Sequence, residues 1–364
     1  MKELILNELS KKENTAAQKD FSAYIKATYN VTDTTKPARL LKKVEGITEM
    51  WIEKVSPARA VSVPVQIEPC LEYTFAETGN YKMYFKFEGT TIADNIFQNC
   101  TSLTSIVIPE GVETIGEYAF AVCTSLTSIV IPEGVTSIGE KAFYGCTSLA
   151  SIEIPEGVTK ISSSAFAGCA SLASVSLPNT LTKIGLYVFW NCTALRSVKL
   201  PSSLKTIEAG TFKDCTALAS VIIPQGVIKI KSDVFASCDA LADVKIPESV
   251  KIIGDGAFYD CCSLMTINIP EGVTRIGSYA FYNCIALADV KIPGSVESIG
   301  KGAFWGCASL AAIDIPENVG RICSDAFRNC SSLKKVTVDL GHTQTGTNLF
   351  LGCDELVSVT PPGK

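Results

Sequence analysis

Twelve cysteines recur at regular intervals, one at every twenty-third position, and they are the side chains with the most evident capacity for chemistry. They are Cys100, Cys123, Cys146, Cys169, Cys192, Cys215, Cys238, Cys261, Cys284, Cys307, Cys330 and Cys353. Thiols can bind metal ions, form disulfides or act as nucleophiles. A nucleophilic thiol needs a base within reach, usually a histidine, and His342 is the one histidine of the chain. We therefore predict no enzymatic activity, no catalytic residues and no cofactor.

The regular spacing also argues against a metal centre and against disulfides. Repeats that stack would place these thiols along a line, whereas a structural zinc site needs a tetrahedron of ligands. Parallel side chains that leave adjacent strands in one direction rarely reach the torsion of a disulfide. The pattern favours a buried row of free thiols with weak S–H donors. Cys70, Cys262 and Cys323 lie outside the row, and the sequence leaves their redox state open.

Two apolar positions accompany each cysteine and define a 23-residue repeat. A phenylalanine stands three residues before each one, from Phe97 to Phe350, and a leucine three residues after it, from Leu103 to Leu356. A short strand follows the leucine, as in the L-x-x-I-x-I segment at 126–131, in which alternate residues face inward. In ten successive repeats, from Pro109 to Pro316, a proline ends this strand.

The second half of each repeat returns the chain to the core. Val135 and Ile138 are its inward residues in one unit, and a glycine such as Gly139 or Gly277 follows in seven of eleven repeats. We interpret this glycine as a turn residue with positive φ. Ala142 and Phe143 would then close the unit in a short helical or 3₁₀ turn. One unit cannot bury its apolar face alone, so stacked repeats must share a continuous core, with parallel strands about 4.8 Å apart.

The repeat resembles a known family. Residues 115–132 read I-G-E-Y-A-F-x-x-C-T-S-L-T-S-I-x-I-P, which is similar to the BspA-like leucine-rich repeat of the Treponema pallidum class. The likeness extends from about Ile92 to Thr360. It implies an α/β leucine-rich-repeat solenoid: a right-handed curved ribbon with a parallel β-sheet on the concave face and short helical turns on the convex face. It also implies a surface or secreted adhesin that binds host matrix proteins or other cells.

The ends of the chain depart from the repeat. We predict a non-repetitive segment at 1–69, a cap at 70–91 and about twelve repeats at 92–364. A helix is expected from Ala16 to Tyr29, capped by Asn14 and Thr15, with Phe21, Tyr24, Ile25 and Thr28 on one face. Alternating residues at 71–75 and 81–87 predict a hairpin whose second strand is a degenerate first rung. In the last repeat Asp339 replaces the proline and His342 takes the inward valine position, which indicates a cap.

Outward residues of the strands are the candidate ligand-binding positions on the concave face. The charged ones are Arg196, Lys199, Asp243, Lys245, Asp289, Lys291 and Asp314. Asp243 could pair with Lys245, and Asp289 with Lys291. The alternative is a solvated sheet face that is charged for solubility. Tyr259, Tyr282 and Trp305 fall on consecutive repeats and could form an aromatic strip for protein or glycan contacts; the alternative is packing between repeats.

Stacked glutamates offer one further site. Glu110, Glu133 and Glu156 follow successive prolines, as do Glu248 and Glu271. Carboxylates in register could hold calcium, and solvated loop ends are the alternative. We predict no metal.

Composition limits the partners further. The formal net charge is −5, from 32 basic and 37 acidic residues, which gives no electrostatic basis for nucleic-acid binding and no polybasic membrane patch. The N-terminus lacks a signal-peptide pattern, and no long apolar run predicts membrane insertion. We expect a monomer that recognises a protein or glycan at the cell surface. The alternative is a cytoplasmic interaction scaffold, which the missing signal peptide and the many thiols favour.

Overall fold

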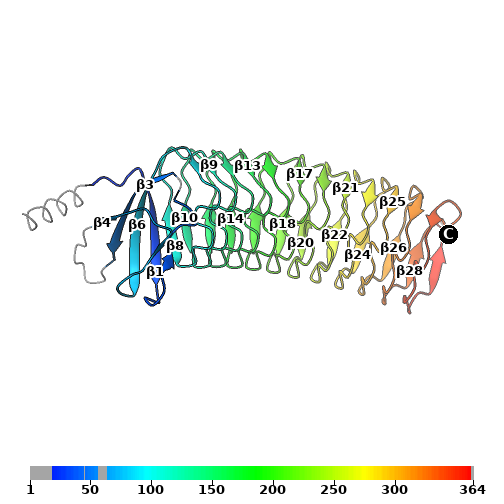
Figure 1. Ribbon diagram of the computed structural model, residues 1–364. Coiled ribbons are helices and arrows are strands. Elements are labelled where there is room, and N and C mark those ends of the chain that lie inside the picture. The colour runs from blue at the N-terminus through cyan, green and yellow to red at the C-terminus, as the bar shows by residue number, and fades with distance from the viewer. Residues whose placement is uncertain (1–18, 45, 56–63, 362–364) are drawn as a thin grey trace, which may run out of the picture.

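The computed structural model describes residues 19–44, 46–55 and 64–361. The chain forms an elongated parallel β-solenoid of about twelve coils stacked side by side, with a small sheet at its N-terminal end (Figure 1). Every regular element in these residues is a β-strand. The predicted solenoid with parallel strands is therefore confirmed, and the helical component is not.

Each coil contributes a first strand after its leucine, and most neighbouring first strands pair in parallel with a shift of one repeat, as in Ser105 to Ser128. They are β8 (Leu103–Val107), β10 (Ser128–Val130), β12 (Ser151–Glu153), β14 (Ser174–Ser176), β16 (Ser197–Lys199), β18 (Ser220–Ile222), β20 (Asp243–Lys245), β22 (Thr266–Asn268), β24 (Asp289–Lys291), β26 (Ala312–Asp314), β28 (Lys335–Thr337) and β30 (Ser358–Thr360). In most of them one buried residue lies between two exposed ones, so a row of side chains faces solvent. We call this row the first-strand face.

A second, shorter strand follows the proline turn of each coil. These strands are β7 (Thr91–Ile92), β9 (Thr114–Ile115), β11 (Ser137–Ile138), β13 (Lys160–Ile161), β15 (Lys183–Ile184), β17 (Thr206–Ile207), β19 (Lys229–Ile230), β21 (Ile252–Ile253), β23 (Arg275–Ile276), β25 (Ser298–Ile299), β27 (Arg321–Ile322) and β29 (Gln344–Thr345). From β7 to β27 the isoleucine is buried and its predecessor lies nearer solvent. We call the row of these predecessors the second-strand face.

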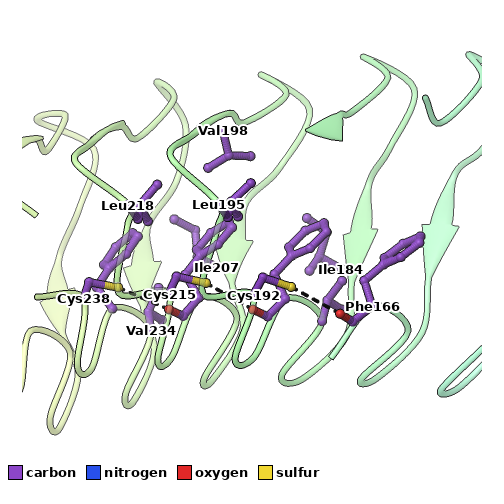
Figure 2. Close-up of a cluster of buried hydrophobic side chains, with 14 of the residues drawn as sticks. Phe166, Ile184, Cys192, Leu195, Val198, Ile207, Cys215, Leu218, Val234 and Cys238 are labelled. Carbon is purple, nitrogen blue, oxygen red and sulfur yellow. Dashed lines mark hydrogen bonds between the residues drawn. The ribbon is translucent and has the colours of Figure 1, made fainter. Parts of the chain in front are cut away.

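The phenylalanines form a continuous stack through the core. Phe97 and Phe120 have ring centroids 5.2 Å apart and planes 6° from parallel, and the stack continues to Phe350. Leucines and cysteines of the repeat are buried beside the rings (Figure 2). This core explains why the three positions recur without exception, since each side chain packs against its own copy in the next coil.

The expected helical turns are wrong, because the backbone between the second strand and the cysteine cannot be helical. Two positions in every coil, the fifth before the cysteine and the one directly before it, have positive φ, as at Tyr118 and Val122. Left-handed residues interrupt a right-handed helix. Their amides donate instead to the next coil: Tyr118 to the Glu140 carbonyl at 2.8 Å and Val122 to the Tyr144 carbonyl at 2.6 Å. A third ladder of hydrogen bonds therefore joins the coils.

The interpretation of the repeated glycine is also wrong. Gly139 and Gly277 are not among the residues with positive φ. A Cβ added to Gly139 would lie 2.6 Å from the carbonyl carbon of Gly116, and one added to Gly277 would lie 2.5 Å from the amide nitrogen of Asp255. The glycine is therefore favoured by close approach between successive coils rather than by a left-handed turn.

The N-terminal end differs most from the prediction. Residues 24–31 form strand β1 (Tyr24–Val31), not the end of a helix, and residues 14–18 lie outside the described part. Ile25, Ala27, Tyr29 and Val31 are all buried, which is the two-residue period of a strand. The helical prediction relied on the three- and four-residue spacing of the residues at 21, 24, 25 and 28, and it did not use the alternation of apolar residues from Ile25 to Val31.

The predicted hairpin and degenerate first rung are not formed. Strand β6 (Gly79–Phe87) pairs antiparallel with β1 and with β3 (Ile47–Lys54), which in turn pairs with β4 (Val65–Ile67). Strand β5 (Glu72–Tyr73) pairs with β2 (Ala38–Arg39) instead. Strand β1 lies between β6 and β8, so an antiparallel sheet closes the first coil. Strands from all three predicted segments share this sheet; the boundaries of those segments stay a prediction.

In the last coil the inward position is taken by Thr343 rather than His342. The His342 side chain is 84% exposed, and its Nδ1 lies 2.6 Å from a carboxylate oxygen of Asp339. The Thr343 hydroxyl is buried and donates to the Val319 carbonyl at 2.9 Å. Without the proline, the chain gains room to shift by one residue, and the smaller, less polar side chain is the one that becomes buried.

Candidate functional site

The row of cysteines is a structural ladder. Each thiol from Cys123 to Cys353 donates a hydrogen bond to the carbonyl oxygen of the phenylalanine 26 residues earlier, as from Cys215 to Phe189 at 3.1 Å. Cys100 donates to the carbonyl of Leu40, the residue directly after β2. All fifteen cysteines of the chain are free. Burial raises the pKa of the ten thiols from Cys100 to Cys307, in Cys123 to about 12. These protonated, enclosed thiols have the weak-donor role that the sequence predicts.

The described residues hold no group of three histidine, cysteine or acidic side chains placed to bind a metal ion. The half-buried Cys70, Cys262 and Cys323 lie outside the ladder. Burial raises the pKa of Cys70 and of Cys262. Neither of these two therefore has the lowered pKa of a reactive thiolate, and the absence of a metal stays a prediction.

The seven charged residues predicted as ligand-binding positions are all exposed. Lys199, Lys245 and Lys291 are the last residues of strands β16, β20 and β24, and they point away from the core. Asp314 ends β26, while Arg196 directly precedes β16. Neither expected ion pair is present among the described residues: Asp243 and Lys245 form none, and Lys291 Nζ lies 3.2 Å from Glu271 of the preceding coil instead of pairing with Asp289. Their role in binding stays a prediction.

Sequence reasoning overlooked an apolar residue within this charged row. Ile222 is 63% exposed and is the register partner of Lys199 on one side and of Lys245 on the other. The alternation of β18 places it outward, and that pattern was available in the sequence. The first-strand face therefore presents an exposed apolar side chain to solvent, with a lysine on either side of it.

The three rings predicted as an aromatic strip are in contact with one another, and their role in binding stays a prediction. Tyr259 and Tyr282 stack with centroids 4.6 Å apart and planes 6° from parallel, and Tyr282 meets Trp305 edge-on at 5.5 Å. Arg328 covers Trp305, with its guanidinium carbon 4.5 Å from the ring centroid. All three rings are half-buried. The rings thus pack between coils and also leave their outer edges exposed.

A basic groove that was not predicted from the sequence runs along the second-strand face. Its volume is about 600 Å³, and its basic side chains are Lys160, Lys183 and Lys205. The first two are register partners on adjacent strands. The spacing of one repeat between these two was visible in the sequence, but they belong to very short strands, which the sequence did not distinguish from turns.

Comparison with protein families identifies the repeat. The pattern described as "BspA type Leucine rich repeat region (6 copies)" matches residues 27–150, 90–216, 136–265 and 251–364, which together span most of the chain. The chain belongs to the BspA-type leucine-rich repeat family. Proteins with leucine-rich repeats of this type are typically binding modules rather than enzymes.

Two solved bacterial structures resemble this BspA-type protein. A leucine-rich repeat protein from Bacteroides ovatus is 29% identical, with 86% of this chain and 93% of that chain covered and a TM-score of 0.55. A leucine rich cell surface protein from Faecalibacterium prausnitzii is 30% identical, with coverage of 76% and 84% and a TM-score of 0.51. No curated protein shows significant sequence similarity to the chain. In the part of the BspA-type chain that the structure describes, no helix could cross a membrane.

Proposed function

We propose that the chain is a non-enzymatic recognition module at the bacterial surface that binds a protein or a glycan through its first-strand face. The observation that carries this proposal is the contrast between inward and outward positions within the one chain. The core positions repeat Phe, Cys and Leu in all twelve coils, whereas the last residue of the first strand varies among the coils and includes Val, Glu, Ser, Lys, Ile, Asn, Asp and Thr. Solenoids offer such surfaces for binding because the fold does not constrain the outward side chains.

The centre of the proposed site is Ile222 with Lys199 and Lys245 on either side. An exposed apolar side chain enclosed by charges is the usual arrangement of a small interaction patch, with an apolar centre and a polar rim. Lys291 and Asp314 continue the row toward the C-terminal end. The patch therefore suits a partner that has an apolar group and acidic groups beside it.

An adhesin that binds host matrix proteins or other cells is the specific form of this proposal. Membership of the BspA-type family supports it, and the similar protein from Faecalibacterium prausnitzii is described as a cell surface protein. The fifteen free thiols favour a second candidate, an intracellular interaction scaffold, because unpaired cysteines are typical of reducing compartments. Fractionation of the source cell, with detection of the native protein, distinguishes the two.

The decisive experiment is a binding screen against host matrix proteins, mucins and glycans at two salt concentrations. The triple variant Lys199→Glu, Lys245→Glu and Lys291→Glu should keep its circular dichroism and melting temperature but lose binding. The variant Lys36→Glu, Lys82→Glu and Lys251→Glu makes the same charge change elsewhere on exposed positions and should bind normally. Undiminished binding by the first variant would contradict the proposed site and direct attention to Tyr259, Tyr282 and Trp305.

A further inference from the structure

The ladder between the second strands is interrupted in the middle of the solenoid. The second strands from β7 to β15 form one sheet, and the second strands from β17 to β29 form another. In the described chain no pairing joins β15 to β17. The stacked phenylalanine rings of neighbouring coils are also farther apart at this position than earlier in the stack. Phe189 and Phe212 have centroids 5.6 Å apart, and Phe212 and Phe235 5.7 Å, compared with 5.2 Å between Phe120 and Phe143.

The basic groove lies across this interruption. It includes residues of both β15 and β17, with Lys183 on one side and Lys205 on the other. Lys160 is the register partner of Lys183, and Lys229 is the register partner of Thr206, the residue after Lys205. Lys229 lies one coil beyond the residues that line the groove. All four lysines are exposed, and none belongs to an ion pair among the described residues. Four free cations thus lie on four successive coils.

The acidic side chains of the groove leave this charge largely uncompensated. Glu208 is held by Lys231 at 2.6 Å, and Glu140 is held by Lys141 at 3.3 Å. Glu117 lies at the far end, two coils before Lys160. The groove therefore has a positive centre with its carboxylates paired or distant.

We propose that this groove, together with Lys229 on the next coil, binds a linear acidic polysaccharide that carries sulfate or carboxylate groups. The polymer would lie along Lys160, Lys183 and Lys205 in the groove and continue to Lys229. Adjacent coils are about 4.8 Å apart, so the lysines present cations at intervals along the solenoid axis. An extended polyanion that lies along this axis can contact all four at once. The hydroxyls of Ser162, Ser163, Thr182 and Thr206 line the groove and supply hydrogen-bonding groups for sugar hydroxyls.

The lining favours a polysaccharide over an acidic peptide. Protein partners bind mainly through aromatic and apolar anchors that fill pockets. The apolar residues of the groove, Ile161 and Ile184, are buried and present no such pocket. This inference rests on the proposed recognition function. It adds a second binding surface, the groove on the second-strand face, and acidic polysaccharides as the ligands of that surface.

The test measures retention of the purified full chain on immobilised heparin and on polygalacturonate, with neutral dextran as the uncharged polymer. The double variant Lys183→Glu and Lys205→Glu should lose affinity for an acidic polymer by at least about tenfold, because two of four cationic contacts become anionic. The variant Lys36→Glu and Lys82→Glu should behave like the unaltered chain. Binding should weaken with added salt, and dextran should not retain any of the three proteins.

Three outcomes would overturn the inference. The first is equal retention of the double variant and the unaltered chain, and the second is failure of the unaltered chain to bind either acidic polymer. The third is equal or tighter retention on polyglutamate, which would assign the groove to acidic peptides. If the chain binds no acidic polymer but binds a matrix protein through Lys199, Lys245 and Lys291, the proposed function stands and this inference fails. Matching melting temperatures exclude misfolding of the variants.

Discussion

The thiol of Cys215 donates a hydrogen bond to the carbonyl oxygen of Phe189, which lies 26 residues earlier in the chain and 3.1 Å away. Both groups are in the core, where buried polar groups are usually hydrogen-bonded, and the same carbonyl also accepts a hydrogen bond from the Cys192 amide at 3.2 Å. The contact explains why cysteine, rather than alanine or serine, recurs at this position. Its side chain is apolar enough for full burial and still provides one donor.

Replacement of this donor should destabilise the protein. We expect Cys215→Ala to lower the free energy of unfolding by about 0.5–1.5 kcal/mol, because it removes one of the two hydrogen bonds that the Phe189 carbonyl accepts. Urea titration followed by circular dichroism measures this change. Cys262→Ala is the matched control at a half-buried thiol outside the ladder, and it should change stability by less than about 0.5 kcal/mol. Equal effects of the two substitutions would refute the role of the ladder.

Thiol labelling should separate the two classes of cysteine. In the native protein we expect Cys70, Cys262 and Cys323 to react with a thiol reagent first, because the twelve ladder thiols are enclosed. In denaturant without reductant, all fifteen should react. Fewer than fifteen reactive thiols would reveal disulfides, and rapid labelling of all fifteen in the native protein would show that the ladder is accessible.

Stability should decrease in alkaline solution. A thiol whose pKa is about 9 when unfolded and about 12 when folded, as in Cys123, stays protonated in the native state while the unfolded chain ionises. The unfolded state then binds fewer protons, so the free energy of unfolding is unaffected below about pH 8.5 and falls above it, by up to about 1.4 kcal/mol per pH unit for each such thiol. Urea midpoints at pH 7, 9 and 10 measure this. A constant midpoint would show that the thiols are not shielded.

Substitution of a phenylalanine in the stack should destabilise the protein more than substitution of a half-buried aromatic residue outside it. Phe212→Ala removes a fully buried ring between Phe189 and Phe235, and we expect a loss of about 3–5 kcal/mol in the coils around it. Tyr144→Ala, at a half-buried position directly after a stack residue, should cost clearly less. Thermal unfolding monitored by calorimetry compares the two. A larger effect at Tyr144 would contradict the assignment of the core.

The sequence predicted the solenoid because its core positions repeat without exception. Phe97, Cys100 and Leu103 begin three columns that the structure places in one stacked core. The exposed lysines at 199, 245 and 291 were also predicted, since the two-residue period of a strand determines which side chains face outward.

The errors arose where local sequence did not determine the backbone. The left-handed positions are filled by residues as different as Tyr118, Lys141 and Gly210, so no residue type indicates them. Hydrogen bonds to the next coil stabilise that conformation, and such bonds are tertiary. Likewise, strand β1 is stabilised by β6 and β8, partners that begin only at Gly79 and Leu103, far along the chain. The basic groove was missed because Lys160 and Lys183 lie on two-residue strands, which the sequence did not distinguish from turns.

The left-handed positions and the thiol ladder have a consequence for how such a gene can change. Each of these hydrogen bonds joins a donor in one coil to an acceptor in an adjacent coil, and the same pair of repeat positions is used in every coil. If one whole repeat is removed or duplicated, the coils that become neighbours can therefore form the same hydrogen bonds. A deletion that is not a whole number of repeats would put a phenylalanine opposite a strand. Unequal recombination between the similar DNA segments that encode the coils can therefore add or remove whole repeats. Selection can then act on the length of the solenoid.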